Sequence, residues 1–144
     1  MDLFLIKMKE DFHNLGFEID GILHLTGKQT LTCLQQGAIL IDVREDYEIA
    51  LKDFGLNNKL ECPYTAFDRL YTTLPRNIPL IIADCVGIHS KEAVKKLLEN
   101  RFTKVANLIG GIATWERDGL PMNTDIETMS GQCMCQIKSR KSKS

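Results

Sequence analysis

Short runs of purely apolar residues alternate along the chain with segments whose apolar residues recur at helical spacing. We predict buried strands over the apolar runs, at Ile22–Leu25, Ala38–Asp42, Leu80–Asp84 and Val105–Ile109. We predict helices in the segments that follow them, at Lys28–Gln36, Lys91–Asn100 and around Thr114–Arg117. Uninterrupted apolar strands separated by helices are typical of a parallel sheet covered on both faces. The pattern therefore predicts an α/β fold with a central, mostly parallel sheet.

The two ends of the chain depart from this repeating pattern. Apolar residues recur at helical spacing over Lys7–Leu15 and Gly16 follows them, so we predict a short helix that covers the core. After Met122 the apolar period stops, and the basic, serine-rich segment Lys138–Ser144 is expected to be flexible. We accordingly divide the chain into a helical extension at 1–21, a main domain at 22–122 and a flexible tail at 123–144.

The composition is that of one ordinary globular domain. The 144 residues are 44% hydrophobic and 26% charged, and their net charge is −1. Such a balance gives no overall positive field, so nucleic acid is an unlikely partner. The apolar runs Ala38–Ile41 and Leu80–Ala83 are far shorter than the ~20 residues of a membrane helix. The segment Met1–Ile6 carries an acid where a secretory signal has positive charge, so we expect a cytoplasmic protein without a membrane partner.

The position of Cys85 makes it the candidate nucleophile. It follows a predicted buried strand and precedes a short loop and a helix, and α/β sheets bind ligands at this carboxyl edge. Backbone amides of such a loop form an anion-binding concavity, and Gly87 gives the loop conformational freedom while Ser90 is a candidate helix N-cap. A thiol held there is expected to have a pKa lowered from about 8.5 into the range ~3.5–7.5. The alternative is that Cys85 is a small buried hydrophobic residue.

The other cysteines and histidines carry less information. Cys33 and Cys62 lie in predicted regular elements and are expected to be packed. Cys133 and Cys135 form a Cys-x-Cys pair, which has too few ligands for structural zinc. We expect no metal site and no disulfide framework, because the number of cysteines is odd. A thiol of the Cys-x-Cys pair is a candidate resolving group for Cys85 if the tail reaches it.

Three blocks of this chain together resemble the single-domain rhodanese family of thiosulfate and persulfide sulfurtransferases. The first is Leu40–Glu45, an Asp-Val-Arg segment with Glu48 beyond it. The second is Cys85 with its glycine-containing loop, and the third is Leu108–Trp115 with Gly119–Pro121 after it. They occur in the family's order within 22–122, which we therefore expect to be a rhodanese-like domain.

The resemblance implies a reaction and a set of residue roles. Cys85 attacks the outer sulfur of a donor, becomes a persulfide and passes that sulfur to a thiol or other nucleophile. The donor is a small sulfur-containing anion or a persulfidated protein, and no cofactor is implied. Asp42 and Arg44 match positions whose expected role is structural, by charge-assisted hydrogen bonds. The loop amides are expected to bind the donor and the persulfide, from the residues Val86, Gly87, Ile88, His89 and Ser90.

Three departures from the family pattern bear on activity. The Cys85 loop is one residue shorter than the common loop, with Gly87 closer to the cysteine. His89 occupies the place where the family often has arginine, so thiosulfate is expected to be a poor donor. The usual Gly-His-Ile is missing from Lys52–Asn58. These features leave open a catalytically weak binding or regulatory module, whereas the missing arginine disfavours phosphatase activity.

Overall fold

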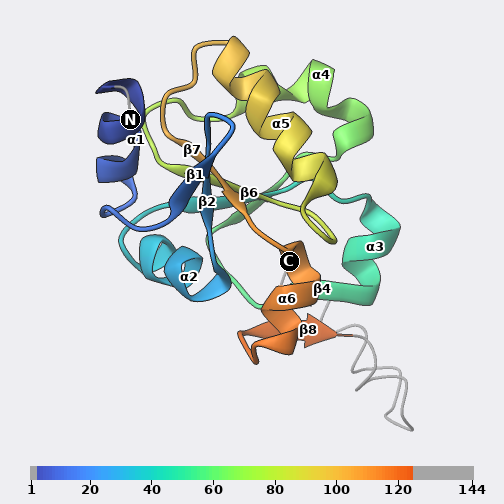
Figure 1. The fold of residues 1–144 in the computed structure, drawn as a ribbon. Coiled ribbons are helices and arrows are strands. Elements are labelled where there is room, and N and C mark those ends of the chain that lie inside the picture. Colours follow the sequence, from blue (N-terminus) through green and yellow to red (C-terminus); the bar gives the residue numbers. More distant parts are fainter. Residues whose placement is uncertain (1–2, 125–144) are drawn as a thin grey trace, which may run out of the picture.

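A six-stranded sheet forms the centre of residues 3–124, the part of the chain that the computed structural model describes (Figure 1). Its strands lie in the order β1-β2-β7-β6-β3-β5. They are β1 (Phe17–Ile19), β2 (Ile22–Leu25), β3 (Ile39–Asp42), β5 (Lys59–Glu61), β6 (Leu80–Ala83) and β7 (Val105–Leu108). Every neighbouring pair is parallel except β1 and β2. The predicted α/β fold with a mostly parallel sheet is thus confirmed.

Helices cover both faces of this sheet (Figure 1). They are α1 (Leu3–Asp11), α2 (Gly27–Gln35), α3 (Asp46–Leu51), α4 (Phe67–Leu70), α5 (Ile88–Glu99) and α6 (Gly111–Arg117), with short 3₁₀ turns at Tyr64–Ala66 and Tyr71–Thr73. Figure 1 shows α4 and α5 on one face and α2 on the other. The central strands β6 and β7 are therefore buried from both sides, which explains why β6 is fully apolar and why Asn107 is the one polar residue of β7.

The predicted helices exist, but their boundaries differ from the predictions. The helix α2 is capped as expected by Thr26, whose side chain accepts from the Gln29 amide at 3.2 Å. The helix α1 begins and ends four residues earlier than predicted, and Asn14 after it adopts a left-handed conformation. The helix α5 begins at Ile88, so Ser90 lies in its first turn and is not its N-cap as predicted. Its N-cap is Gly87, at φ 97°.

The segment predicted as an N-terminal extension is packed into the molecule. Met8 and Phe12 of this segment are fully buried in the main core. Strand β1, which the sequence analysis missed, pairs with β2 through a tight turn at Asp20 and Gly21, both with positive φ. The expected boundary between residues 21 and 22 therefore falls inside a β-hairpin.

A second, two-stranded sheet joins a strand from the middle of the chain to the last described strand. Strand β4 (Lys52–Phe54) pairs antiparallel with β8 (Met122–Thr124), beyond the expected domain end at residue 122. Trp115 is fully buried beside this sheet, where its indole N–H donates to the Pro121 carbonyl at 2.7 Å. No helix within residues 3–124 is long and apolar enough to cross a membrane.

Candidate active site

Cys85 lies in an exposed loop at the carboxyl end of β6. Strand β6 runs between β3 and β7, and Asp42 at the end of β3 is in register with Ala83 at the end of β6. Because parallel strands bring their carboxyl ends to one edge, the segments that follow β3, β6 and β7 converge around Cys85. The predicted location of Cys85 agrees with this geometry.

The first turn of α6 holds the backbone of the Cys85 loop. The amide of Ile112 donates to the Asp84 carbonyl at 2.9 Å, and the amide of Ala113 donates to the Cys85 carbonyl at 3.1 Å. This approach requires glycine at position 111, since a Cβ atom there would lie 2.4 Å from the Asp84 oxygen. Gly111 also has φ +59°. The loop is therefore fixed from the side of β7.

The carboxylate of Asp84 occupies most of the loop's backbone donors. It accepts hydrogen bonds from the amides of Gly87, of His89 at 2.7 Å and of Ser90 at 3.3 Å. Among the five amides that were expected to bind a donor, only those of Val86 and Ile88 have no acceptor within the described residues. The other three amides already donate to a buried side chain of the loop itself, and their binding of a sulfur donor stays a prediction.

The side chain of Ser90 faces the interior and not the donor. Its hydroxyl donates to the Asn107 side-chain oxygen, and the Asn107 amide group contacts His24 Nδ1 at 3.1 Å. All three side chains are buried. Burial and the charge of Lys91 lower the pKa of His24. This polar chain ties the start of α5 to β7 and β2.

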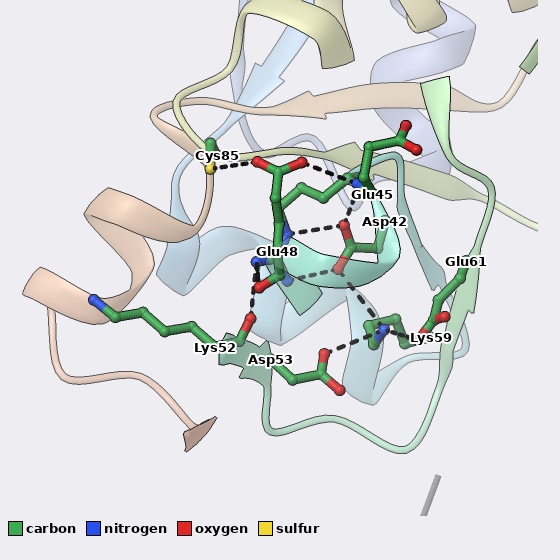
Figure 2. A network of polar contacts seen from close by, with 9 residues as sticks. Asp42, Glu45, Glu48, Lys52, Asp53, Lys59, Glu61 and Cys85 are labelled. Atoms are coloured by element: carbon green, nitrogen blue, oxygen red, sulfur yellow. Dashed lines mark hydrogen bonds and ion pairs between the residues drawn. The ribbon is translucent and has the colours of Figure 1, made fainter. Parts of the chain in front are cut away.

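A second carboxylate, that of Glu48 on α3, contacts the thiol directly. The Cys85 thiol donates to Glu48 Oε2, with 3.3 Å between sulfur and oxygen (Figure 2). The other oxygen, Oε1, accepts from the Glu45 amide at 2.9 Å, which fixes the carboxylate at the start of α3. Glu48 was part of the Asp-Val-Arg block in the sequence, but its contact with Cys85 was not predicted.

These surroundings raise the pKa of the Cys85 thiol, whereas the sequence analysis predicted a lowered pKa. Partial burial is the largest cause, followed by the hydrogen bond to Glu48 and its negative charge. The Arg44 guanidinium opposes them, and Asp84 adds a further small increase. The predicted lowering is wrong because burial and Glu48 outweigh Arg44, while Asp84 accepts from three of the amides that were expected to stabilise a thiolate.

Asp42 and Arg44 form a buried ion pair. Arg44 Nε and Nη2 donate to the two carboxylate oxygens of Asp42 at 3.0 and 2.9 Å. Arg44 Nη1 donates to the Lys52 carbonyl at 2.8 Å, which connects the pair to the end of α3. Lys59 also contacts Asp42, at 3.7 Å. The contacts are those expected of a structural anchor.

The His89 ring is stacked on Tyr64, away from the backbone donors of the loop. The two ring centres are 3.9 Å apart and the rings are nearly parallel, at 14°. Both rings line a groove of about 330 Å³ whose other residues come mainly from α4 and α5, including Phe67, Glu92 and Lys96. His89 therefore forms part of a wall next to the Cys85 loop.

Two of the four remaining cysteines lie in the described part of the chain. Cys33 and Cys62 are buried free thiols, as predicted, and burial raises the pKa of both. The predicted resolving thiols Cys133 and Cys135 lie outside the described residues. Within residues 3–124, no three His, Cys, Asp or Glu side chains are grouped so as to hold a metal ion.

Asp84 and Glu48 are the site residues that sequence reasoning missed, although each has a local signal. An aspartate directly before a glycine-containing loop is typical of side-chain to backbone hydrogen bonding within the turn. Two glutamates three residues apart, Glu45 and Glu48, are compatible with a capped helix start after β3. Read together, these signals indicate two carboxylates at the same edge of the sheet.

Known proteins with this architecture are found both by sequence and by structure. No protein-family model matches the chain. The thiosulfate sulfurtransferase GlpE of Haemophilus influenzae is 30% identical over 104 residues, which cover 69% of this chain and 93% of that protein. A rhodanese-related protein from Thermoplasma volcanium superposes with a TM-score of 0.62 at 20% identity, over 69% of this chain and 96% of the other. A polysulfide-sulfur transferase from Wolinella succinogenes also gives 0.62, at 22% identity, over 83% and 86%.

The fold that this chain shares with these structures is that of a rhodanese-like α/β domain, and in this chain it carries an exposed cysteine at the carboxyl edge of the sheet. This chain belongs to the single-domain rhodanese family of sulfurtransferases.

Proposed function

We propose that the protein transfers sulfane sulfur through a persulfide on Cys85. The thiolate of Cys85 attacks the transferable sulfur of a small anionic donor or of a persulfidated protein, and the rest of the donor leaves. A thiol acceptor then attacks the outer sulfur and restores Cys85. Asp42 and Arg44 support the loop from behind and do not touch the donor.

The accessibility of Cys85 is the observation that carries this proposal. Among the described cysteines, Cys33 and Cys62 are buried and Cys85 alone is exposed. The Cys85 carbonyl accepts a hydrogen bond from the Ala113 amide of α6, and its thiol donates one to Glu48. Both the backbone and the sulfur of Cys85 are therefore fixed in position. A fixed and exposed nucleophile is what a transfer reaction with two successive partners needs.

The raised pKa of Cys85 favours a second candidate, a binding or regulatory module with little turnover. A thiol that is mostly protonated at neutral pH is a weak nucleophile. Such a module would bind sulfur donors or persulfidated partners at the same loop without completing transfer.

Intact-protein mass spectrometry distinguishes the two candidates. The reduced protein is incubated with thiosulfate, with polysulfide or with methanethiosulfonate, and is then offered a thiol acceptor. The proposal predicts an adduct of about 32 Da, one sulfur atom, which maps to Cys85 and disappears when the acceptor is added. The Cys85→Ser variant should show no adduct, and Cys62→Ala is the matched control that should retain it. An adduct that persists in Cys85→Ser, or none from any donor, would contradict the proposal.

A further inference from the structure

We propose that Asp84 is a resident anion in the Cys85 loop and makes the protein select sulfur donors of low negative charge, such as organic persulfides, over the dianion thiosulfate. This inference rests on the proposed transfer of sulfur through Cys85. It assigns Asp84 the role of a specificity-determining residue.

The first argument is the occupation of the loop donors. The Asp84 side chain is buried and accepts from three backbone amides at the start of α5, those of Gly87, His89 and Ser90. Amides at the N-terminus of a helix are the groups that usually bind an external anion. Here a covalently attached carboxylate has satisfied them, and its negative charge is already present when a donor arrives.

The second argument is the charge balance around the thiol. Glu48 adds another carboxylate, 3.3 Å from the Cys85 sulfur. Arg44 is the cation that lowers the pKa of Cys85, but its Nε and Nη2 are bound to both oxygens of Asp42. A dianion that approaches the sulfur therefore meets the Glu48 carboxylate directly, the charge of the buried Asp84 in the same loop, and a guanidinium that is already neutralised. Like charges at such short range repel strongly where solvent is partly excluded.

The third argument is the character of the loop side chains. Val86 lies in the Cys85 loop and Ile88 begins α5 directly after it, and their side chains are 55% and 61% exposed. Apolar side chains at these two positions offer a small inorganic dianion neither a hydrogen bond nor a positive charge. They do offer contact area to an organic group attached to the transferable sulfur.

The transfer step balances for both kinds of donor. With an organic persulfide, Cys85–S⁻ attacks the terminal sulfur of R–S–SH, the S–S bond of the donor breaks, and the products are Cys85–S–SH and R–S⁻. With thiosulfate, the same attack gives Cys85–S–S⁻ and sulfite, and the dianion must first be brought against the carboxylates. Neither step needs an external oxidant or reductant.

Two donors that differ mainly in charge test the inference. Thiosulfate is a dianion and methanethiosulfonate is a monoanion. Each transfers its outer sulfur by cleavage of an S–S bond, and the leaving group is sulfite or methanesulfinate, respectively. The rate of appearance of the Cys85 adduct is measured for each donor, in the unmodified protein, in Asp84→Asn and in the control Asp118→Asn. Asp118 is an exposed carboxylate after α6 and has no contact with the loop in the structure.

Asp84→Asn is expected to raise the rate with thiosulfate, relative to the rate with methanethiosulfonate, by about tenfold. Asp118→Asn should leave this ratio unchanged. An unchanged ratio in Asp84→Asn, with the fold intact by thermal unfolding, overturns the inference while the proposed function stands. Absence of an adduct from both donors in the unmodified protein would instead overturn the proposed function.

Ionic strength gives a second test that needs no variant. Salt screens repulsion between a donor and fixed carboxylates, and the effect is larger for the dianion. Uptake of sulfur from thiosulfate by the unmodified protein should therefore rise with added KCl more steeply than uptake from methanethiosulfonate. A thiosulfate rate that falls with KCl would show net attraction and would overturn the inference.

Discussion

The carboxylate of Glu48 is, after partial burial, the main cause of the raised pKa of the Cys85 thiol. A thiol whose pKa lies above its ordinary value of about 8.5 is protonated throughout the neutral range, and its reactivity rises only as the pH approaches the shifted pKa. Glu48 contributes in two ways, by accepting the thiol hydrogen bond and by its charge. Both favour the protonated form.

Replacement of Glu48 by glutamine should therefore make Cys85 more reactive. The Glu48→Gln variant keeps the size of the side chain and removes the charge, so the pKa of Cys85 should fall toward its ordinary value. Alkylation of Cys85 by iodoacetamide at pH 7 should become roughly tenfold faster, and the pH profile should move to lower pH.

Asp46→Asn is the matched control, since Asp46 lies on the same helix and is exposed. Its alkylation profile should stay that of the unmodified protein. An equal increase in both variants would attribute the pKa shift to general charge and not to the contact with Glu48.

Single side chains were the least predictable level of this molecule. The position of Cys85 followed from the apolar run before it, because that run fixes where the strand ends. Alternation of side chains along a strand would place Asp84 and Cys85 on opposite faces of the sheet. This alternation does not extend into the loop, where the Asp84 carboxylate accepts hydrogen bonds from the amides of Gly87, His89 and Ser90.

At the scale of elements, the contact between α6 and the Cys85 loop links the first turn of a helix to the reactive cysteine. Gly111 permits this contact, because a side chain at that position would collide with the carbonyl oxygens of Asp84 and Cys85. Those carbonyls accept from Ile112 and Ala113, so a shift of α6 moves the loop that carries the sulfur.

The Gly111→Ala variant should lose both stability and sulfur transfer. The alanine would have to adopt a positive φ, and its methyl group would lie 2.4 Å from the Asp84 carbonyl oxygen. We therefore expect a loss of about 3 kcal/mol in the free energy of unfolding. Urea denaturation measures this loss, and adduct formation on Cys85 measures the effect on the loop.

Gly119→Ala is the comparison for backbone strain alone. Gly119 also has positive φ, at +75°, but nothing lies within 4 Å of a Cβ atom there. It should cost about 1 kcal/mol and leave transfer intact. Equal losses in the two variants would show that the close approach to the loop is unimportant.

The long apolar strands were predictable, whereas the three-residue strands were not. Strands β3, β6 and β7 are buried on both faces and their sequences are accordingly apolar throughout or nearly so. Strand β1 is exposed and β4 contains Lys52 and Asp53, so neither has an apolar run. Their pairing is set by the tertiary fold, which a local pattern does not contain.

At the scale of the whole molecule, the segment before β2 belongs to the same packed unit as the sheet. Phe12 is completely buried, and the carbonyl of this residue accepts from the Cys33 thiol of α2 at 3.7 Å. Met8 is buried in the same core.

The Phe12→Ala variant should therefore destabilise the entire described unit by about 3–5 kcal/mol, the usual cost of removing a buried phenylalanine. Urea denaturation followed by circular dichroism and by Trp115 fluorescence should show one shared transition at lower urea. Phe4→Ala is the control, because Phe4 is 45% exposed on α1, and it should cost under about 1 kcal/mol. Two separate unfolding transitions would contradict this prediction and would indicate that the N-terminal segment is an independent extension.

The short outermost strands β1 and β5 also affect how copies of the protein meet one another. A foreign strand that added to either edge would gain a ladder of only about 10 Å, the length of three residues. Charged side chains stand on both edges, with Glu18 on β1 and Lys59 and Glu61 on β5. Brief, charged edges discourage the sheet-to-sheet joining through which many α/β proteins aggregate. Short length and charge thus protect both ends of the sheet.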